Sequence, residues 1–230
     1  MTITLDPSTP LQWSRVLVRG PQSTAYLQGQ LTQDVVGLDE RGAWSLLLEP
    51  DSAVVSSCFV RRVGSDYELS VARELGEVTL ARLRRFHLRV DCTLELLEAE
   101  SGPFSTLREM LDARMPGPRE LAARLTPHAY GAGLVATTVS FTKGCFTGQE
   151  LVGRLDARGS SVPWRLVYVT GSDVARMDEV VRSFGPSGPQ GVTTSVSDEG
   201  RVLAFAIAHR TILAEGALDA FDDVTVDVVG

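Results

Sequence analysis

The spacing of apolar residues predicts alternating strands and helices over the first 125 residues. Helical spacing follows Ser23, an expected N-cap, and returns over residues 75–86, where arginines at the end suit the helix dipole. Two short helices are expected at residues 104–114 and 119–125, separated by a Pro-Gly-Pro turn. Alternating apolar and polar residues, which indicate half-buried strands, recur at residues 15–19, 44–48, 54–63, 67–72 and 90–97.

The pattern changes beyond Gly159, where short alternating segments are separated by turns rich in Gly and Pro. Such a set of short strands predicts a small antiparallel β-barrel or sandwich. We therefore predict an α+β protein with two domains: an α+β region over residues 1–159 and a C-terminal β-barrel over residues 160–230. The expected strands of the second domain are residues 165–170, 191–196, 202–208 and 224–229.

Composition and charge narrow the class of protein. The chain is 43% hydrophobic and 22% charged, as globular domains are. Its formal net charge of −7 argues against general nucleic-acid binding, which requires clustered Lys and Arg. Neither a secretory signal nor a membrane-spanning run is visible in the sequence. We therefore expect a cytoplasmic protein with no membrane partner.

The cysteines and histidines do not follow the spacing of a metal site. The three cysteines are far apart and form no CxxC pair, and the three histidines are scattered. We therefore expect neither a disulfide framework nor a metal site formed by the protein itself. Free thiols of this kind are typical of a reducing compartment.

Lys143 is the only lysine in the sequence, whereas the other 21 basic residues are arginines. A lysine that persists among arginines suggests a site that requires a compact ammonium whose pKa can be tuned. Chance is the alternative, because a single lysine has to lie somewhere. The position of Lys143 two residues before Cys145, in a glycine-rich segment, favours function.

The residues after Cys145 predict the start of a helix. Thr147 and Glu150 have the spacing of a capping box, and Phe146 could pack on Leu151 as a hydrophobic staple. Gly159 is the expected residue just beyond the helix. Thr147 and Glu150 could serve this structural purpose alone.

Cys145 is the candidate reactive residue. The positive end of the predicted helix and the Lys143 ammonium would both favour a thiolate over a thiol. If residues 143–145 are extended, both side chains project to the same side, and Gly144 leaves room for a partner. The alternative is that Cys145 is a small buried apolar residue, as Cys58 and Cys92 are expected to be.

The segment 143–150, with the sequence KGCFTGQE, resembles a family signature. The signature is K-G-C-[YF]-x-G-Q-E of the YgfZ-type folate-binding proteins, which are relatives of the glycine-cleavage T-protein, an aminomethyltransferase. Residues 25–35 are similar to the F-L-Q-G-Q-L-T-x-D-V segment near the start of that family. The similarity continues at residues 83–91, 125–128, 191–195 and 203–210.

The resemblance implies ferredoxin-like α+β portions, a C-terminal barrel and tetrahydrofolate in a central cavity. In the YgfZ branch it also implies a role in the assembly or repair of iron–sulfur clusters, with iron–sulfur enzymes or assembly proteins as partners. The signature cysteine carries over to Cys145, with Lys143 beside it as the second residue of the functional centre. Residues expected to bind the folate are Gln30, Asp34, Gly144, Gly148, Gln149, Glu150 and Arg154.

The sequence departs from the family at several positions. Ser56 and Ser57 stand where the aminomethyltransferases have an acidic pair, and a hydroxyl cannot replace a carboxylate at the folate nitrogen. A block present in most relatives is shortened near residues 98–104. The glutamate that can contact the pterin has no clear counterpart, since Glu109 and Asp112 are both out of register.

Three functions are therefore compared. The first is a YgfZ-like accessory protein that binds folate and acts through Cys145. The second, next in order, is a binding or scaffolding module whose folate pocket has decayed. The third is a folate-dependent aminomethyltransferase, which the Ser56–Ser57 pair makes the least favoured. Asp34 could also be a turn residue without a binding role.

Overall fold

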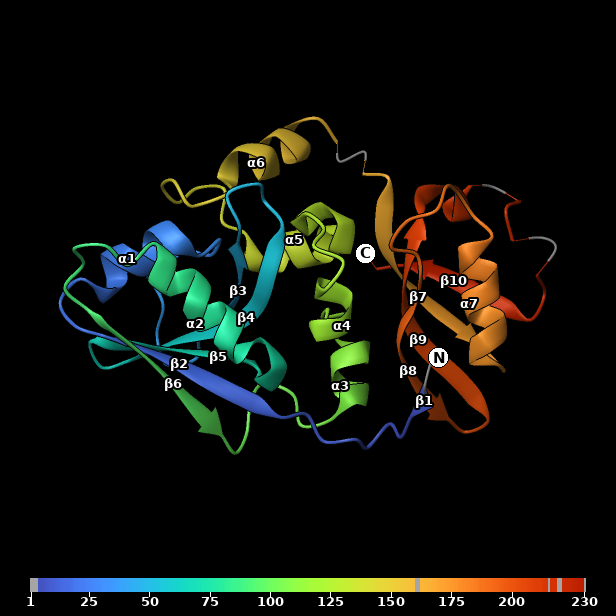
Figure 1. The fold of residues 1–230 in the computed structure, drawn as a ribbon, viewed down its shortest axis with the longest axis horizontal. Coiled ribbons are helices and arrows are strands. Elements are labelled where there is room, and N and C mark those ends of the chain that lie inside the picture. Colours follow the sequence, from blue (N-terminus) through green and yellow to red (C-terminus); the bar gives the residue numbers. More distant parts are fainter. Residues whose placement is uncertain (1–3, 160–161, 215, 219–220, 230) are drawn as a thin grey trace.

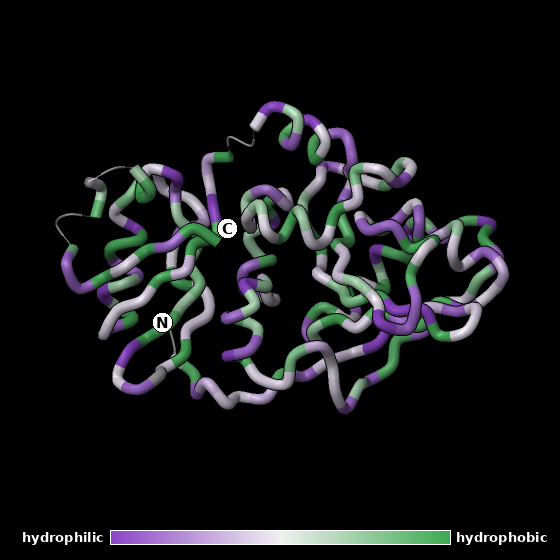
Figure 2. The backbone as a smooth tube through the Cα atoms, turned by 180° about the vertical axis from the view of Figure 1, so that it is seen from behind, coloured by the Kyte–Doolittle hydropathy of each residue, from purple (hydrophilic) through white to green (hydrophobic). Residues whose placement is uncertain are grey.

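The computed structural model describes residues 4–159, 162–214, 216–218 and 221–229. Figure 1 shows two lobes, each built on a β-sheet, with a column of helices between them. The boundary that we predict near residue 160 falls on residues 160–161, outside the described residues, and stays a prediction. The hydropathy colouring of Figure 2 shows apolar stretches along the strands of both lobes.

The first sheet contains the five strands that alternation predicted in the N-terminal half. The strands run in the order β3-β4-β5-β2-β6, and all four pairings are antiparallel. The last strand begins three residues later than predicted, because residues 90–92 form a turn in which the Cys92 N–H donates to the Val90 carbonyl. The strands are β2 (Trp13–Arg19), β3 (Ala43–Leu48), β4 (Val54–Val63), β5 (Asp66–Ala72) and β6 (Thr93–Ala99).

Helices α1 (Ser23–Gln30) and α2 (Gly76–Arg85) cover one face of this sheet (Figure 1). A short 3₁₀ turn, Arg73–Leu75, leads into α2. Apolar residues of both helices and of strands β2, β4 and β5 form one continuous core beneath them. The expected N-cap of α1 is wrong: Ser23 is the first helical residue, and Gln22 precedes it without a side-chain cap.

The chain then crosses between the lobes through a series of short helices, which share a core with both sheets. The two helices predicted around the Pro-Gly-Pro turn are present but shorter than expected. One further helix was not predicted. The elements are α3 (Leu107–Asp112), α4 (Pro118–Leu121), a 3₁₀ turn (Pro127–Tyr130), α5 (Ala132–Thr138) and α6 (Gln149–Ala157).

The second sheet has the order β1-β8-β9-β7-β10, and α7 (Val174–Arg182) packs on it. The four predicted C-terminal strands are present. The sheet also contains an N-terminal strand that pairs in parallel with β8, so it is mixed and not purely antiparallel. No pairing joins its two edge strands among the described residues. The strands are β1 (Thr4–Leu5), β7 (Trp164–Gly171), β8 (Gly191–Asp198), β9 (Arg201–His209) and β10 (Val224–Val228), and a 3₁₀ turn (Arg210–Leu213) follows β9.

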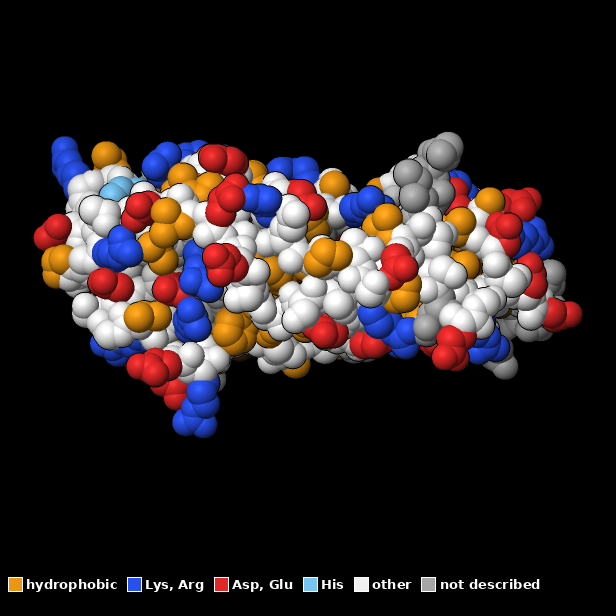
Figure 3. Space-filling view, turned by 90° about the horizontal axis from the view of Figure 1, so that it is seen from below, with side chains coloured by type: hydrophobic (Ala, Val, Ile, Leu, Met, Phe, Trp, Pro, Cys, Tyr) orange, Lys and Arg blue, Asp and Glu red, His pale blue; other side chains and the backbone are white. Residues whose placement is uncertain are grey.

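The surface of the molecule carries both signs of charge. In the face shown by Figure 3, acidic and basic side chains are intermingled over both lobes. Within the described part of the chain, no helix has the length and apolar character needed to cross a membrane.

Candidate functional site

The segment between α5 and α6 carries the signature, and it lies against the end of α1. The Ser140 N–H donates to the Thr32 carbonyl at 3.0 Å, and the Thr147 N–H donates to the Gly29 carbonyl at 3.0 Å. The segment is thus tied at both ends to the chain around residues 29–32. This explains how two stretches more than 100 residues apart in sequence form one structural unit.

Lys143 provides the central link of this unit. Its ammonium donates to the Leu31 carbonyl at 2.6 Å and to the Gln33 carbonyl at 2.9 Å. The residue is only 8% exposed. Burial lowers the pKa of this amine from 10.5 to about 8, and the nearby Asp34 carboxylate opposes the shift. The amine therefore titrates within reach of neutral pH, as a tunable ammonium would.

Cys145 lies in a different environment from Lys143. Cys145 is exposed, whereas the lysine side chain is buried and engaged with backbone carbonyls. The expectation that both side chains project to one side is therefore wrong. Gly144 between them is exposed, and a Cβ built on it would meet no atom within 4 Å. The backbone beside Cys145 is thus accessible, as the sequence suggested.

The predicted capping box at α6 is wrong. Gly148 is the N-cap, in a left-handed conformation with φ of 82°, and the Thr147 hydroxyl donates to the Gly29 carbonyl instead. The Glu150 carboxylate pairs with Arg154 along the helix at 2.7 Å. A Cβ on Gly148 would lie 2.7 Å from the Glu49 carbonyl oxygen, so glycine is required there for both reasons. Gly159 does follow the helix with a φ of 67°, as predicted.

The remaining expected folate-binding residues divide into two groups. Gln149, Glu150 and Arg154 belong to the first two turns of α6. Gln30 accepts a hydrogen bond from the buried Arg82 at 3.2 Å, while Asp34 accepts from the Gln28 amide at 3.0 Å. The structure thus gathers Asp34 with Lys143 and places Gln30 under the end of α2.

Ser56 and Ser57, which replace the acidic pair, are buried and internally bonded. The Thr79 hydroxyl lies 2.9 Å from the Ser56 hydroxyl, and the Ser57 hydroxyl donates to the Pro116 carbonyl at 3.3 Å. The segment that follows α3 therefore covers the sheet face at Ser57. No carboxylate is present at this position to act on a ligand.

A pocket of about 360 Å³ lies between β3, α5 and the residues that flank α3, a size within the range of ~300–1,000 Å³ typical of small-molecule sites. Trp44 and Phe104 line it and stack on each other, with ring centroids 5.4 Å apart and planes at 18°. The Arg114 guanidinium, 3.4 Å from the centroid of the Tyr168 ring, also lines it. Its Nη1 is buried and has no hydrogen-bond partner among the described residues. These three residues were not predicted, although Phe104 stands at the end of the shortened block.

Helix α5 connects this pocket to the signature unit, which consists of residues 140–147 and the residues 29–33 that they contact. Gly133, Leu134 and Thr137 line the pocket. At the end of the helix, the Gln33 amide donates to the Thr137 carbonyl at 3.1 Å, and the Thr32 hydroxyl donates to the Thr138 carbonyl at 2.7 Å. The loop that Lys143 holds is therefore also the loop that anchors one wall of the pocket.

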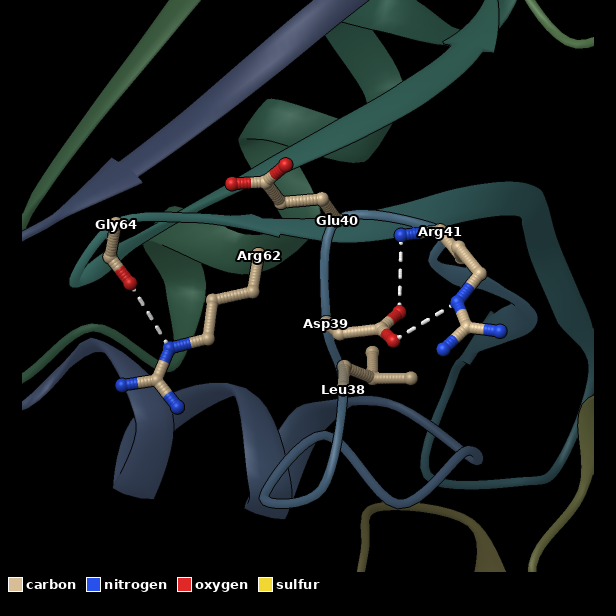
Figure 4. Close-up of a pocket in the computed structure, with 6 residues that line it drawn as sticks. All are labelled: Leu38, Asp39, Glu40, Arg41, Arg62 and Gly64. Atoms are coloured by element: carbon tan, nitrogen blue, oxygen red, sulfur yellow. Dashed lines mark hydrogen bonds and ion pairs between the residues drawn. The ribbon is translucent and has the colours of Figure 1, made fainter.

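A wider hollow of about 530 Å³, shown in Figure 4, lies on the outer edge of the first lobe. Three of its charged groups are already engaged: Asp39 accepts from Arg41 at 3.1 Å, and Arg62 donates to the Gly64 carbonyl at 3.0 Å. None of the expected site residues lines it. We therefore place the candidate site at the signature unit and the pocket beside α5.

Comparison with known proteins agrees with this architecture. No protein-family model matches the chain, and no curated protein sequence matches it. Among solved structures, it is similar to the glycine cleavage system aminomethyltransferase T from Bartonella henselae, with a TM-score of 0.58 over 91% of this chain and 81% of that chain. The two chains share a fold. At 13% sequence identity, the aminomethyltransferase T fold does not by itself assign any residue a role.

Proposed function

We propose that this chain is a YgfZ-like accessory protein that binds tetrahydrofolate or a related folate and supports iron–sulfur cluster assembly or repair. The ligand is held in the pocket beside α5, within the N-terminal region. Cys145 acts on a client or assembly protein, and Lys143 maintains the segment that presents it. No reaction on the folate itself is required.

The observation that carries the proposal is an exposed thiol on a segment that is held in place. Cys145 is exposed, while Lys143 and Thr147 on either side are hydrogen-bonded to residues 29–33. A thiol presented in this way can meet a group on another protein without unfolding the segment. The shared aminomethyltransferase T fold supports the folate part of the proposal.

The pocket beside α5 supports a planar ligand. Trp44 and Phe104 offer aromatic faces, and Arg114 places a positive charge on the pocket wall that favours an anionic group on the ligand. The alternative of a folate-dependent transferase is disfavoured, because Ser56 and Ser57 are buried and bonded within the protein.

Titration with tetrahydrofolate tests the ligand. Because Trp44 lines the pocket, saturating tetrahydrofolate should quench or shift the tryptophan emission of the wild-type protein. Phe104→Ala should weaken binding by about tenfold, which is the loss of roughly 1.4 kcal/mol of stacking. Phe184→Ala is the matched control, since Phe184 packs on Phe221 in the other lobe. Unchanged emission at saturation would leave a scaffolding module without a folate ligand.

A further inference from the structure

We propose that the face of the first sheet opposite α1 and α2 carries a second binding site, built on Arg15, for a small organic carboxylate with an apolar body. The site is a cavity of about 170 Å³ lined by strands β2, β4 and β5 and by residues 101–103. It is separate from the pocket beside α5, and it does not depend on the folate-binding function.

Strand register brings the side chains of this site together. Arg15 pairs with Ser70 across β2 and β5, and Ser70 pairs with Phe59 across β5 and β4. Directly opposed residues share one face of a sheet, with Cβ atoms ~4.5–5.5 Å apart. The neighbouring positions Ser14 and Val16 face the helices, since Ser14 lies against Gly76 and Val16 belongs to the core under α2. The row Phe59–Ser70–Arg15 therefore lies on the face of the sheet opposite α1 and α2.

The side chains that line the cavity carry a net positive charge. Arg61 also lines the cavity, but it is paired with Glu68 through an Nε–Oε2 hydrogen bond of 2.9 Å. The Nε of Arg15 is buried and has no hydrogen-bond partner among the described residues. Arg15 has no acidic partner among the described residues, so an anionic ligand in the cavity would compensate its charge.

The outer wall of the cavity is fixed before any ligand binds. A Cβ on Gly102 would overlap the Trp13 indole, so this glycine allows the loop to pack directly on the ring. The Trp13 indole N–H donates to the Phe104 carbonyl at 2.9 Å, which holds the next residues of the loop. A preformed wall lowers the entropy lost on binding.

The lining defines the class of ligand. A planar guanidinium matches a carboxylate through two parallel hydrogen bonds, and the hydroxyl of Ser70 is a further donor. Phe59 and Pro103 provide apolar contact for the body of the ligand. The cavity is too small for a whole folate, so a single small ring bearing a carboxylate is the ligand that fits.

Titration of the full-length protein with benzoate tests this proposal. The Arg15 Nε–H resonance in an NMR spectrum of ¹⁵N-labelled protein should shift in a saturable manner at millimolar benzoate. Arg15→Gln should weaken binding, measured by calorimetry, by at least about tenfold. Arg62→Gln is the control, because it also removes one positive charge but Arg62 faces the hollow of Figure 4. The affinity of this variant for benzoate should stay within about twofold of wild type.

Two further measurements keep the result decisive. If Arg15→Gln fails to fold, Phe59→Leu should still weaken benzoate binding while the Arg15 resonance continues to respond. Inorganic phosphate serves as the second probe. Equal or tighter binding of phosphate would overturn the assignment to a carboxylate on an apolar body. An unshifted Arg15 resonance, or equal weakening by the Arg15 and Arg62 substitutions, would overturn the site itself.

Discussion

The burial of Lys143 makes the stability of the protein depend on pH in a defined direction. Burial lowers the pKa of the folded-state amine to about 8, whereas the unfolded value is 10.5. Between these values the unfolded chain binds more protons than the folded chain, so the free energy of unfolding rises with pH. The rise in the free energy of unfolding begins near pH 8 and is complete above pH 10.5. Replacing the amine with an apolar side chain removes this contribution.

The magnitude follows from the two pKa values. Between pH 7 and pH 9 the Lys143 contribution to the free energy of unfolding increases by about 1.3 kcal/mol, at 1.36 kcal/mol per unit of pKa difference. Lys143→Met should lack this increase. At pH 9 the variant should also be less stable by about 2 kcal/mol or more, because the Leu31 and Gln33 carbonyls lose their donor.

Urea unfolding at both pH values measures the effect. The quantity to compare is the difference in the free energy of unfolding between wild type and Lys143→Met, because the other titrating groups are common to both proteins. Lys143→Arg is the control, since a guanidinium stays charged across this range and should also lack the pH-dependent gain. If the free energy of unfolding changed equally with pH in wild type and in Lys143→Met, the amine at this position would not have a lowered pKa.

Two other substitutions test parts of the account. Gly148→Ala should destabilise the protein by about 2 kcal/mol or more in urea unfolding, because φ is 82° and the new Cβ would meet the Glu49 carbonyl at 2.7 Å; Gly153→Ala, where no atom lies within 4 Å, should be neutral or stabilising. Burial lowers the pKa of His128 from 6.5, so wild type should lose stability as the pH falls below 6.5. Between pH 6.5 and 5 the melting temperature of His128→Leu should fall less than that of wild type. An equal fall in both proteins would show that His128 does not cause the acid sensitivity.

The strands were predicted well because local alternation determines them. Residues 54–63 were predicted as a strand with the bounds that the structure shows for β4. Helix α7 was not predicted, although Val174, Met177 and Val181 have helical spacing. Strand β1 could not be predicted, since two residues carry no periodicity and its partner is almost 200 residues away.

The signature segment could be identified from the sequence, but its geometry could not. The sequence indicated Lys143 and Cys145 from composition and motif, and the structure places both on the segment that packs against residues 29–33. It could not show that the ammonium is directed to backbone carbonyls, because those carbonyls belong to a loop 110 residues earlier. The capping box failed for a similar reason: contact with the Glu49 carbonyl requires Gly148 at the helix start, and that contact is long-range.

The role of Cys145 is tested most directly by complementation of a strain that lacks its own YgfZ-type protein, with the activity of an iron–sulfur enzyme as the measured quantity. The wild-type chain should restore that activity, Cys145→Ser should not, and the buried Cys92→Ser should, at equal protein levels and with a wild-type melting temperature for Cys145→Ser. Full restoration by Cys145→Ser would contradict the account.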